Sequence, residues 1–250
     1  QLHAHTKHDF VIVSDADVCV PPDFLANVVA PLRDPGVGLV NCFYRLANPT
    51  NLAMRWEAVA INADFWSQVL QSQSLKPLDF ALGAVMATTR RQIDGIGGFG
   101  VLRDYLADDY ELGHRIAKRN GGIVLCPVVV ECWSPPLNWN EVWIHQLRWA
   151  RTIRVCQPLP YFFSLLSNAT LWPVLWLVTQ RTSAVLWSVG LCLGVRALTA
   201  FLNHRKLSPA TARASDFWLA WVKDLLNAAI WVCSFLGNTI EWRGERYRVR

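Results

Sequence analysis

Three groups of polar residues in this sequence have the types and the spacing that could do chemistry. The first is Asp15-Ala16-Asp17, which directly follows the apolar run at 10–13. Two carboxylates at the end of a strand can hold a divalent cation through hard oxygen ligands, and such an ion could help a diphosphate to leave. An EF-hand loop is excluded, because Cys19 and Val20 stand where a further oxygen ligand and a glycine are required. A helix-capping Asp beside a solvated one is the structural alternative.

The second group is Asp108-Asp109, which heads an expected helix after the glycine-rich stretch 95–100. Acidic residues in the first turn of a helix are stabilising by themselves, so this pair does not need a catalytic role. The functional alternative is a general base, because crowding of like charges can raise the pKa of a carboxylate towards its working range. The glycines predict a tight turn, since residues 90–94 do not resemble the buried strand that precedes a dinucleotide-binding loop.

The third group is formed by His145, Arg148 and Trp149 in the stretch HQLRW. Arginine can bind a phosphate bidentately, and tryptophan can pack against an acceptor molecule. The alternative is a helix at a membrane surface with ordinary Arg and Trp anchors.

The elements that must position the first two groups alternate between strand and helix, which predicts an α/β fold. The predicted buried strands cover 10–13, 37–44, 84–89 and 123–130, and the predicted helices cover 24–32, 52–75 and 108–120. The seven cysteines are scattered and contain no CxxC pair, so a disulfide framework or a zinc site is not expected and a reducing compartment is favoured.

The composition of the whole chain excludes one class of protein, and the second half of the chain differs in pattern from the first. Only 17% of all residues are charged and 52% are hydrophobic, which excludes a disordered chain. Residues 138–154 form an amphipathic pattern in which Arg148, Arg151 and Arg154 share one stripe, as in helices that lie on a membrane. These arginines and the basic residues 204–213 favour the cytoplasmic side.

Three membrane-spanning helices are predicted after this amphipathic segment. Residues 155–180 contain no charged residue, 183–202 are interrupted only by Arg196, and 217–240 only by Lys223-Asp224. The alternative for 155–202 is a buried helical hairpin. Three full spans would place the basic tail 241–250 on the side opposite to the other basic segments, so the topology stays open.

The order of these motifs resembles the family 2 glycosyltransferases and, more closely, the ceramide glucosyltransferase family (family 21), including its bacterial hopanoid-type members. The resemblance covers residues 8 to about 154, with a weaker similarity at 242–247. The residues that carry it are SDADV (14–18) with PPD (21–23), GGF (97–99), LADDYELG (106–113) and HQLRWAR (145–151).

The resemblance implies a GT-A fold, an inverting reaction without a covalent intermediate, and a UDP-sugar donor such as UDP-glucose or UDP-N-acetylglucosamine. It also implies a Mg²⁺ or Mn²⁺ ion and a ceramide- or hopanoid-like lipid acceptor, with no nucleic acid as partner. By the same resemblance Asp15 and Asp17 bind the metal and the diphosphate, Asp17 more directly, and Asp109 is the base. Arg148 binds the donor, and the acceptor site contains Asp108, His145 and Trp149. His145 departs from the family pattern, which has Gln or Arg there, while Gln146 comes one position late.

The expected organisation is therefore a partial GT-A domain (1–135), an interfacial helix (136–154), membrane spans (155–240) and a basic tail (241–250). The family's first aspartate would precede residue 1, so an N-terminally truncated chain is expected. The protein is expected in a membrane with its catalytic domain on the cytoplasmic face. The rival interpretations are a haloacid-dehalogenase-type phosphatase with Asp15 as nucleophile and Asp17 as acid, and a catalytically inactive membrane scaffold. No clear catalytic lysine supports the phosphatase.

Overall fold

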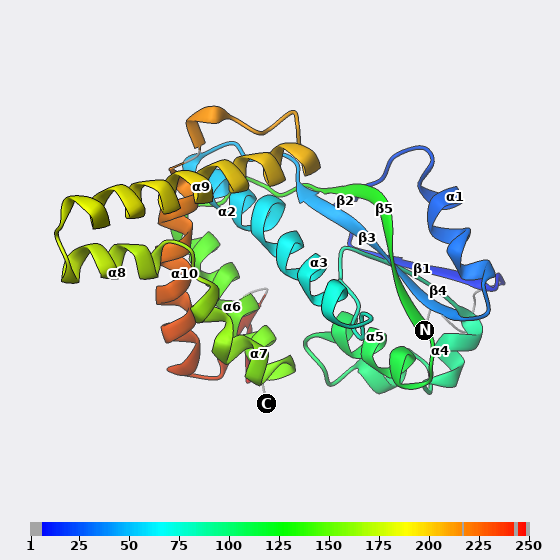
Figure 1. Ribbon diagram of the computed structural model, residues 1–250. Helices are drawn as coiled ribbons and strands as arrows, with labels where there is room; N and C mark the ends of the chain where they lie inside the picture. The colour runs from blue at the N-terminus through cyan, green and yellow to red at the C-terminus, as the bar shows by residue number, and fades with distance from the viewer. Residues whose placement is uncertain (1–6, 217, 243–244, 249–250) are drawn as a thin grey trace. The chain divides into compact units, whose positions relative to one another are not determined.

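A computed structural model describes residues 7–216, 218–242 and 245–248 of the chain (Figure 1). The described residues form two compact units. The sheet unit contains the residues up to Ala47 together with Trp66–Ser134, and the helical unit contains Asn48–Phe65 together with the residues from Pro135 onward. Each unit is described by itself below.

A five-stranded mixed sheet forms the centre of the sheet unit, with the order β1-β4-β3-β5-β2. The long strands β3 and β5 run parallel to each other, whereas β1–β4, β3–β4 and β2–β5 are antiparallel pairs. The four predicted strands are thereby confirmed as strands, and the mixed α/β architecture with a parallel pair fits a GT-A-like fold. The strands are β1 (Phe10–Ser14), β2 (Val18–Cys19), β3 (Val37–Leu46), β4 (Val85–Thr89) and β5 (Gly122–Cys132).

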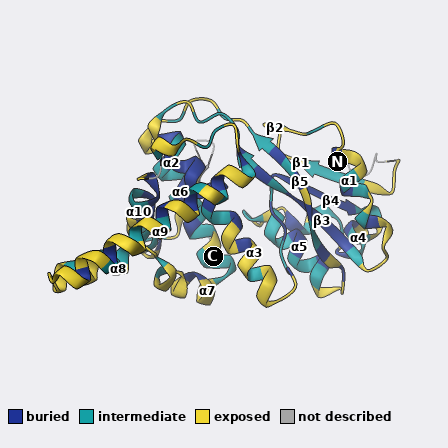
Figure 2. Cartoon of the chain, turned by 45° about the horizontal axis from the view of Figure 1, so that its top comes forward, coloured by how far each residue is buried: buried dark blue, intermediate teal, exposed yellow. Residues whose placement is uncertain are grey.

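Short helices surround this sheet, and its central strands supply the core. Val40, Val85 and Val130 have no exposed surface, and Figure 2 shows the central strands as largely buried. The edge strand β1 differs, because Phe10 is 39% exposed and the remaining residues are at best half-buried. The expectation that residues 10–13 form a buried strand is therefore wrong, since within the described chain β1 pairs on one side only. The helices are α1 (Phe24–Val29), η2 (Pro31–Arg33), α3 (Trp66–Leu75), α4 (Arg90–Gly95), η4 (Phe99–Leu102) and α5 (Asp108–Lys118).

Residues 52–75 are helical, as predicted, but the helix changes its winding on the way. It begins as α2 (Leu52–Val59), continues as the π-helical segment η3 (Ala60–Phe65) and ends as α3. Asn51 caps its start, because the Asn51 side chain accepts a hydrogen bond of 3.0 Å from the backbone N–H of Met54.

The helical unit packs its helices around an apolar core that includes Trp56, Val142, Leu219 and Ile230. Helix α6 lies against α2 and α10, and α8 runs beside α9 (Figure 1). The elements are α6 (Trp139–Cys156), α7 (Pro158–Phe163), η5 (Ser164–Ser167), α8 (Leu171–Thr179), α9 (Ser183–Leu207), η6 (Ala214–Asp216), α10 (Leu219–Phe235), β6 (Thr239–Trp242) and β7 (Glu245–Arg248).

The described residues contain fewer candidate membrane spans than the three that the sequence predicts. The uncharged stretch 155–180 is not one helix, because the segments Pro158–Ser167 and Leu171–Thr179 are bent by 50°. Asn168 lies at this break and accepts hydrogen bonds from the backbone N–H groups of Thr170 (3.2 Å) and Leu171 (2.8 Å), which starts a new helix. By length and composition, the described residues contain one helix that could cross a membrane, α9, or two if the bent pair is one span.

The alternative of a buried helical hairpin at 155–202 is also wrong. In α9 the side chains of Trp187 and Leu191 are 80% and 70% exposed, and Figure 2 shows much of α8 and α9 as exposed. Of the predicted tail, residues 243–244 and 249–250 lie outside the described residues.

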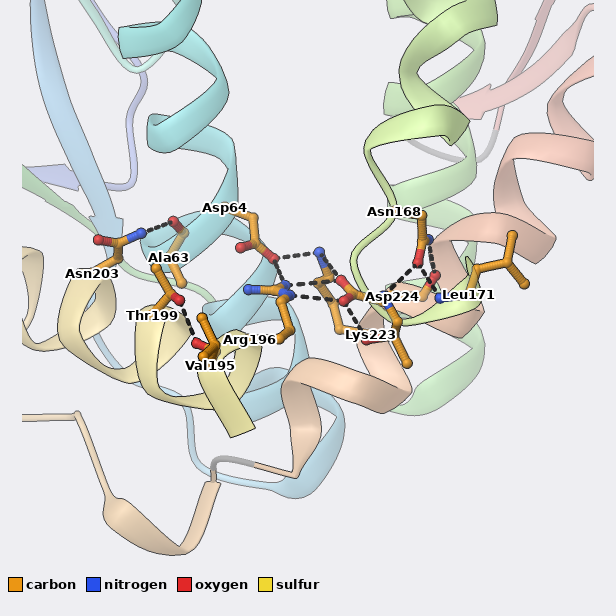
Figure 3. Close-up of polar contacts among 11 residues, drawn as sticks. Ala63, Asp64, Asn168, Leu171, Val195, Arg196, Thr199, Asn203, Lys223 and Asp224 are labelled. Carbon is orange, nitrogen blue, oxygen red and sulfur yellow. Dashed lines mark hydrogen bonds and ion pairs between the residues drawn. The ribbon is translucent and has the colours of Figure 1, made fainter. Parts of the chain in front are cut away.

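The charged residues that interrupt the predicted second and third spans pair with one another inside the helical unit (Figure 3). Arg196 donates two hydrogen bonds of 2.8 Å to the carboxylate of Asp224 and a third of 2.8 Å to Asp64. Lys223 bridges the same two carboxylates, with Nζ 2.8 Å from Asp224 Oδ1. These four side chains form a nearly buried network with balanced charge, which offsets the cost of removing them from water.

Arg151 and Arg154 of the amphipathic stripe bind acceptors within the helical unit. Arg151 donates to the carbonyls of Thr239 and Cys233, and Arg154 donates to the carbonyl of Gly237 and the side chain of Asn238. Both therefore bind the end of α10 and the segment that follows it, where a helix leaves its last carbonyls without partners. These contacts give Arg151 and Arg154 a role within the helical unit, and the membrane-surface role of this helix stays a prediction.

Candidate functional site

Asp15 and Asp17 lie directly after β1, where the carboxyl ends of β1, β3 and β5 meet one edge of the sheet. The backbone of this segment is fixed at both ends. The N–H of Asp15 donates to the carbonyl of Ala84 at 3.1 Å, and the carbonyl of Asp17 accepts from the N–H of Trp133 at 2.9 Å. Both aspartates are exposed. Open α/β sheets bind ligands at this edge, so the position agrees with a binding role.

Asp108 and Asp109 begin α5, as the sequence predicts, but their surroundings differ. Asp108 is exposed, and its side chain accepts a hydrogen bond of 2.9 Å from the backbone N–H of Asp109. Asp109 is half-buried, and its carboxylate lies against Gly83, where an added Cβ atom would come within 2.9 Å of Oδ2. Of these two adjacent aspartates, only Asp109 is partly buried within the sheet unit.

The environment of Asp109 changes its acidity. Burial raises the pKa of Asp109 from the ordinary 3.8 to about 6, and the negative charges of Asp108 and Asp15 add to this rise. Hydrogen bonds from the backbone N–H groups of Tyr110 and Asp109 act in the opposite direction. Since Asp15 and Asp109 interact electrostatically, the structure brings the first two motifs of the sequence together within the sheet unit.

Two residues near these aspartates were missed by the sequence reasoning. Tyr44 is a buried residue of β3 two positions before the end of the strand, and Cys132 is the last residue of β5. Burial raises the pKa of the Cys132 thiol to about 12, helped by the charges of Asp17 and Asp15. Burial also raises the pKa of the Tyr44 hydroxyl, helped by Cys132, Asp109 and Asp15. Their positions near the carboxyl ends of two parallel strands were the signal that could have identified them.

The position of Asp109 depends on the loop at 80–83. This loop connects α3 to β4 and contacts both β3 and α5. Asn41, fully buried on β3, accepts a hydrogen bond of 3.1 Å from the N–H of Leu82. Helix α5 approaches the same loop so closely that a Cβ atom on Gly113 would lie 2.1 Å from the N of Ala81. Gly113 thus allows α5 to pack directly on the loop that carries Gly83.

The carboxylates at this edge fit a divalent cation that is shared with a substrate. Among the described residues, no group of three or more His, Cys, Asp or Glu side chains could hold a metal ion by itself. Mg²⁺ in phosphate-binding sites is typically held by one or two carboxylates together with the phosphates of the substrate. Asp15 and Asp17 are two exposed carboxylates at that edge, two positions apart in the chain.

The third motif lies on α6 in the helical unit. A capping box starts this helix: the Asn138 side chain accepts from the N–H of Glu141 at 3.0 Å, and Glu141 accepts from the N–H of Asn138 at 2.7 Å. His145, the partly buried Arg148 and Trp149 share one face, because residues three and four apart are neighbours on a helix. The rings of His145 and Trp149 meet edge to face with centroids 4.8 Å apart.

The described units thus hold the predicted site residues in two sets. Asp15, Asp17, Asp108 and Asp109 belong to the sheet unit, whereas the motif on α6 belongs to the helical unit. Each set is placed within its own unit.

Comparison with known protein families decides the identity of the chain. The model of one family, described as glycosyl transferase family 21, matches residues 1–250, which is the whole sequence. This chain belongs to glycosyl transferase family 21. The match confirms the resemblance carried by the motifs and extends it from residues 8–154 to the whole sequence.

Membership in family 21 makes the chain a glycosyltransferase and implies a nucleotide-sugar donor and an acceptor. The phosphatase interpretation of Asp15 and Asp17 finds no support in this match. Family 21 is membrane-associated, and α9 has the length and composition to cross a bilayer.

Proposed function

We propose that this family 21 glycosyltransferase transfers a hexose from a UDP-sugar to the hydroxyl group of a ceramide- or hopanoid-like lipid at the cytoplasmic face of a membrane. UDP-glucose and UDP-N-acetylglucosamine are the proposed donors. The observation that carries the proposal is the environment of Asp109, a half-buried carboxylate with a raised pKa beside Asp15, in a chain that matches the family over its whole length.

Asp109 is the proposed general base. A pKa of about 6 leaves most of this carboxylate ionised at pH 7 while making it a stronger base than an ordinary aspartate. In the proposed reaction the acceptor oxygen attacks the anomeric carbon of the sugar and the bond from that carbon to the diphosphate oxygen breaks. The bonding electron pair leaves with the diphosphate, and the hydroxyl proton passes to Asp109. One such displacement inverts the anomeric centre and needs no covalent intermediate.

Asp15 and Asp17 are the proposed ligands of a Mg²⁺ or Mn²⁺ ion, with Asp17 in the more direct position. When bound, this ion neutralises negative charge on the diphosphate. Arg148 is proposed to bind the donor, since a guanidinium matches phosphate oxygens bidentately. Asp108, His145 and Trp149 are proposed to contact the acceptor.

The test is a transfer assay with the purified protein in liposomes that contain Mn²⁺. UDP-glucose, UDP-galactose and UDP-N-acetylglucosamine are each offered with ceramide, diacylglycerol or a hopanoid polyol, and new glycolipids are detected by mass. We expect one pairing to give a hexosylated lipid, and Asp109→Asn to abolish it. Asp104→Asn is the matched control, because the Asp104 side chain is 82% exposed. If no pairing yields a product or releases UDP, the proposed function is wrong.

A further inference from the structure

A buried carboxylate that none of the three motifs contains lies beside the third one. Glu57 is on α2 in the helical unit and is only 1% exposed, next to the core residues Trp56 and Ala58. Burying a carboxylate among apolar side chains is unfavourable unless hydrogen-bond donors compensate for the lost water. The groups that donate hydrogen bonds to Glu57 therefore indicate the role of this residue.

Both donors come from adjacent residues of α6. Oε1 of Glu57 is 2.6 Å from Nδ1 of His145 and 2.9 Å from Nε2 of Gln146. The His145 ring is thus held at Nδ1 by a carboxylate and along its side by Trp149, whose own ring lies 6.1 Å from that of Phe65. The ring has little freedom to rotate.

His145 and Gln146 have different places on the helix. Gln146 is turned by about 100° from His145 around the helix axis and is only 9% exposed. The side chain of His145 is 29% exposed and shares its face with Arg148 and Trp149. Gln146 therefore contributes a hydrogen bond inside the helical unit, whereas His145 is partly accessible to a substrate on the face that carries the motif.

The contact at Nδ1 determines what the other ring nitrogen can offer. A carboxylate at Nδ1 keeps the proton on that nitrogen, so in the neutral ring Nε2 carries a free lone pair. For Nε2 of His145, no hydrogen-bond partner is found among the described residues. A lone pair accepts a hydrogen bond from a hydroxyl group but not from an unprotonated phosphate oxygen, which suits an alcohol better than a diphosphate.

We propose that Glu57 is a positioning residue for the transfer reaction proposed above: it fixes the ring of His145 so that Nε2 accepts a hydrogen bond from a hydroxyl of the lipid acceptor. This inference rests on the proposed function and adds a residue to it.

Steady-state kinetics with UDP-glucose and a short-chain ceramide separate this role from a structural one. Glu57→Gln keeps the shape of the side chain and removes its charge, and we expect the acceptor KM to rise about tenfold, the cost of one hydrogen bond to a charged group. The donor KM should stay within about twofold of its original value, since Nε2 contacts the acceptor only. Glu141→Gln, a change of the same type on α6 that preserves the capping box, should leave both constants unchanged.

A double-mutant cycle tests whether Glu57 acts through His145. In the His145→Ala background, Glu57→Gln should have no further effect on the acceptor KM, because the ring that it orients is gone. Additive effects, an equal rise in the donor KM, or an unchanged acceptor KM in Glu57→Gln would overturn the proposal. Circular dichroism and the thermal midpoint of each variant identify losses that come from unfolding.

Nuclear magnetic resonance of protein labelled with ¹⁵N-histidine gives a measurement that does not depend on transfer. The neutral His145 ring should carry its proton on Nδ1, and Glu57→Gln should shift it towards Nε2. A ring protonated mainly on Nε2 in the unmodified protein would overturn the proposal. Failure of the proposed function appears separately, as an unmodified protein that makes no glycolipid.

Discussion

Replacing Asp109 by asparagine should stabilise the protein while it abolishes glycosyl transfer. The substitution keeps the size of the side chain and its carbonyl oxygen, and it removes the charge that the half-buried site disfavours. It also replaces the basic carboxylate oxygen that would take the proton of the acceptor with an amide group that is not basic. One change therefore tests both the environment of the carboxylate and its proposed role.

The magnitude follows from the shift in acidity. The pKa of Asp109 rises from the ordinary 3.8 to about 6, with burial as the largest cause. At 1.36 kcal/mol per pH unit, ionised Asp109 destabilises the folded protein by about 3 kcal/mol at pH 7. Solvent reaches part of this carboxylate, so we expect the variant to gain about 1–3 kcal/mol, or about 2–10 °C in Tm for a chain of this length.

The gain has a defined dependence on pH. Below pH 3.8 Asp109 is protonated in the folded and the unfolded protein, so the charge costs nothing and the variant gains nothing. Between pH 3.8 and about 6 the folded protein binds more protons than the unfolded chain, so the original protein loses stability as the pH rises. The advantage of Asp109→Asn should therefore grow through this window and stay constant above it.

The measurement compares thermal unfolding of the two proteins at pH 4.5, 6 and 7.5, in buffer with EDTA so that no divalent cation alters the electrostatics at Asp15. The transfer rate of the original protein should fall about tenfold from pH 7 to pH 5, as the ionised fraction of Asp109 falls from about 91% to about 9%. Asp104→Asn, at a highly exposed position, should change neither curve.

Two results would refute the reasoning. Near-normal turnover of Asp109→Asn would show that Asp109 is not the base. A variant that is less stable than the original at pH 7.5 would show that the site stabilises the charge, in which case burial does not govern the pKa. A gain in stability without loss of activity would support the environment and reject the role.

Three further perturbations have direct outcomes. Asp17→Ala should weaken Mn²⁺-dependent binding of UDP-glucose at least about tenfold in calorimetric titration, and unchanged metal dependence would contradict the ligand role. Gly83→Ala places a methyl group 2.9 Å from Oδ2 of Asp109 and should lower kcat about 10–100-fold with little change in Tm, whereas Gly100→Ala, which meets open space, should not. Asp224→Asn leaves two buried cations short of negative charge and should lower the unfolding free energy by about 3–5 kcal/mol; an unchanged Tm would show that the network of Figure 3 does not hold the helices.

The strands and helices of the sheet unit could be predicted because their signals are local. Residues 37–44 and 123–130 are mostly apolar runs between turn residues, the second rich in β-branched residues, and both form strands. The burial of 10–13 was predicted wrongly from the same kind of run, since burial depends on which strands pair on either side. The two-residue strand β2 has too few residues to give a pattern.

The membrane spans show the limit of hydropathy as a guide. Hydropathy averaged over a window of residues does not register that the side chain of Asn168 interrupts 155–180. This side chain accepts hydrogen bonds from the N–H groups at the start of a new helix. It also counts Arg196 and Lys223 as costs, although both are paired with Asp64, a carboxylate from another helix. Asp64, which completes this pairing, lies far from the predicted spans in the sequence, and nothing local marks it as a partner.

The site residues were predictable where a motif carries them and missed where distant contacts do. Glu57 is a single acidic residue in a helix of ordinary composition, and only the fold of the helical unit places it against His145. Tyr44 and Cys132 belong to strands that the sequence predicts well, but their effect on acidity depends on which carboxylates lie beside them.

Asp108 and Asp109 show most clearly why the choice of a catalytic group needs the fold. They are adjacent, identical in type and both in the first turn of α5, so the helix dipole favours the charged form of each. Their surroundings differ because of Gly83. Only a residue without a side chain at this position lets the carboxylate of Asp109 lie against the backbone. No motif contains this glycine, yet the raised pKa that would make Asp109 the base depends on the burial that it permits.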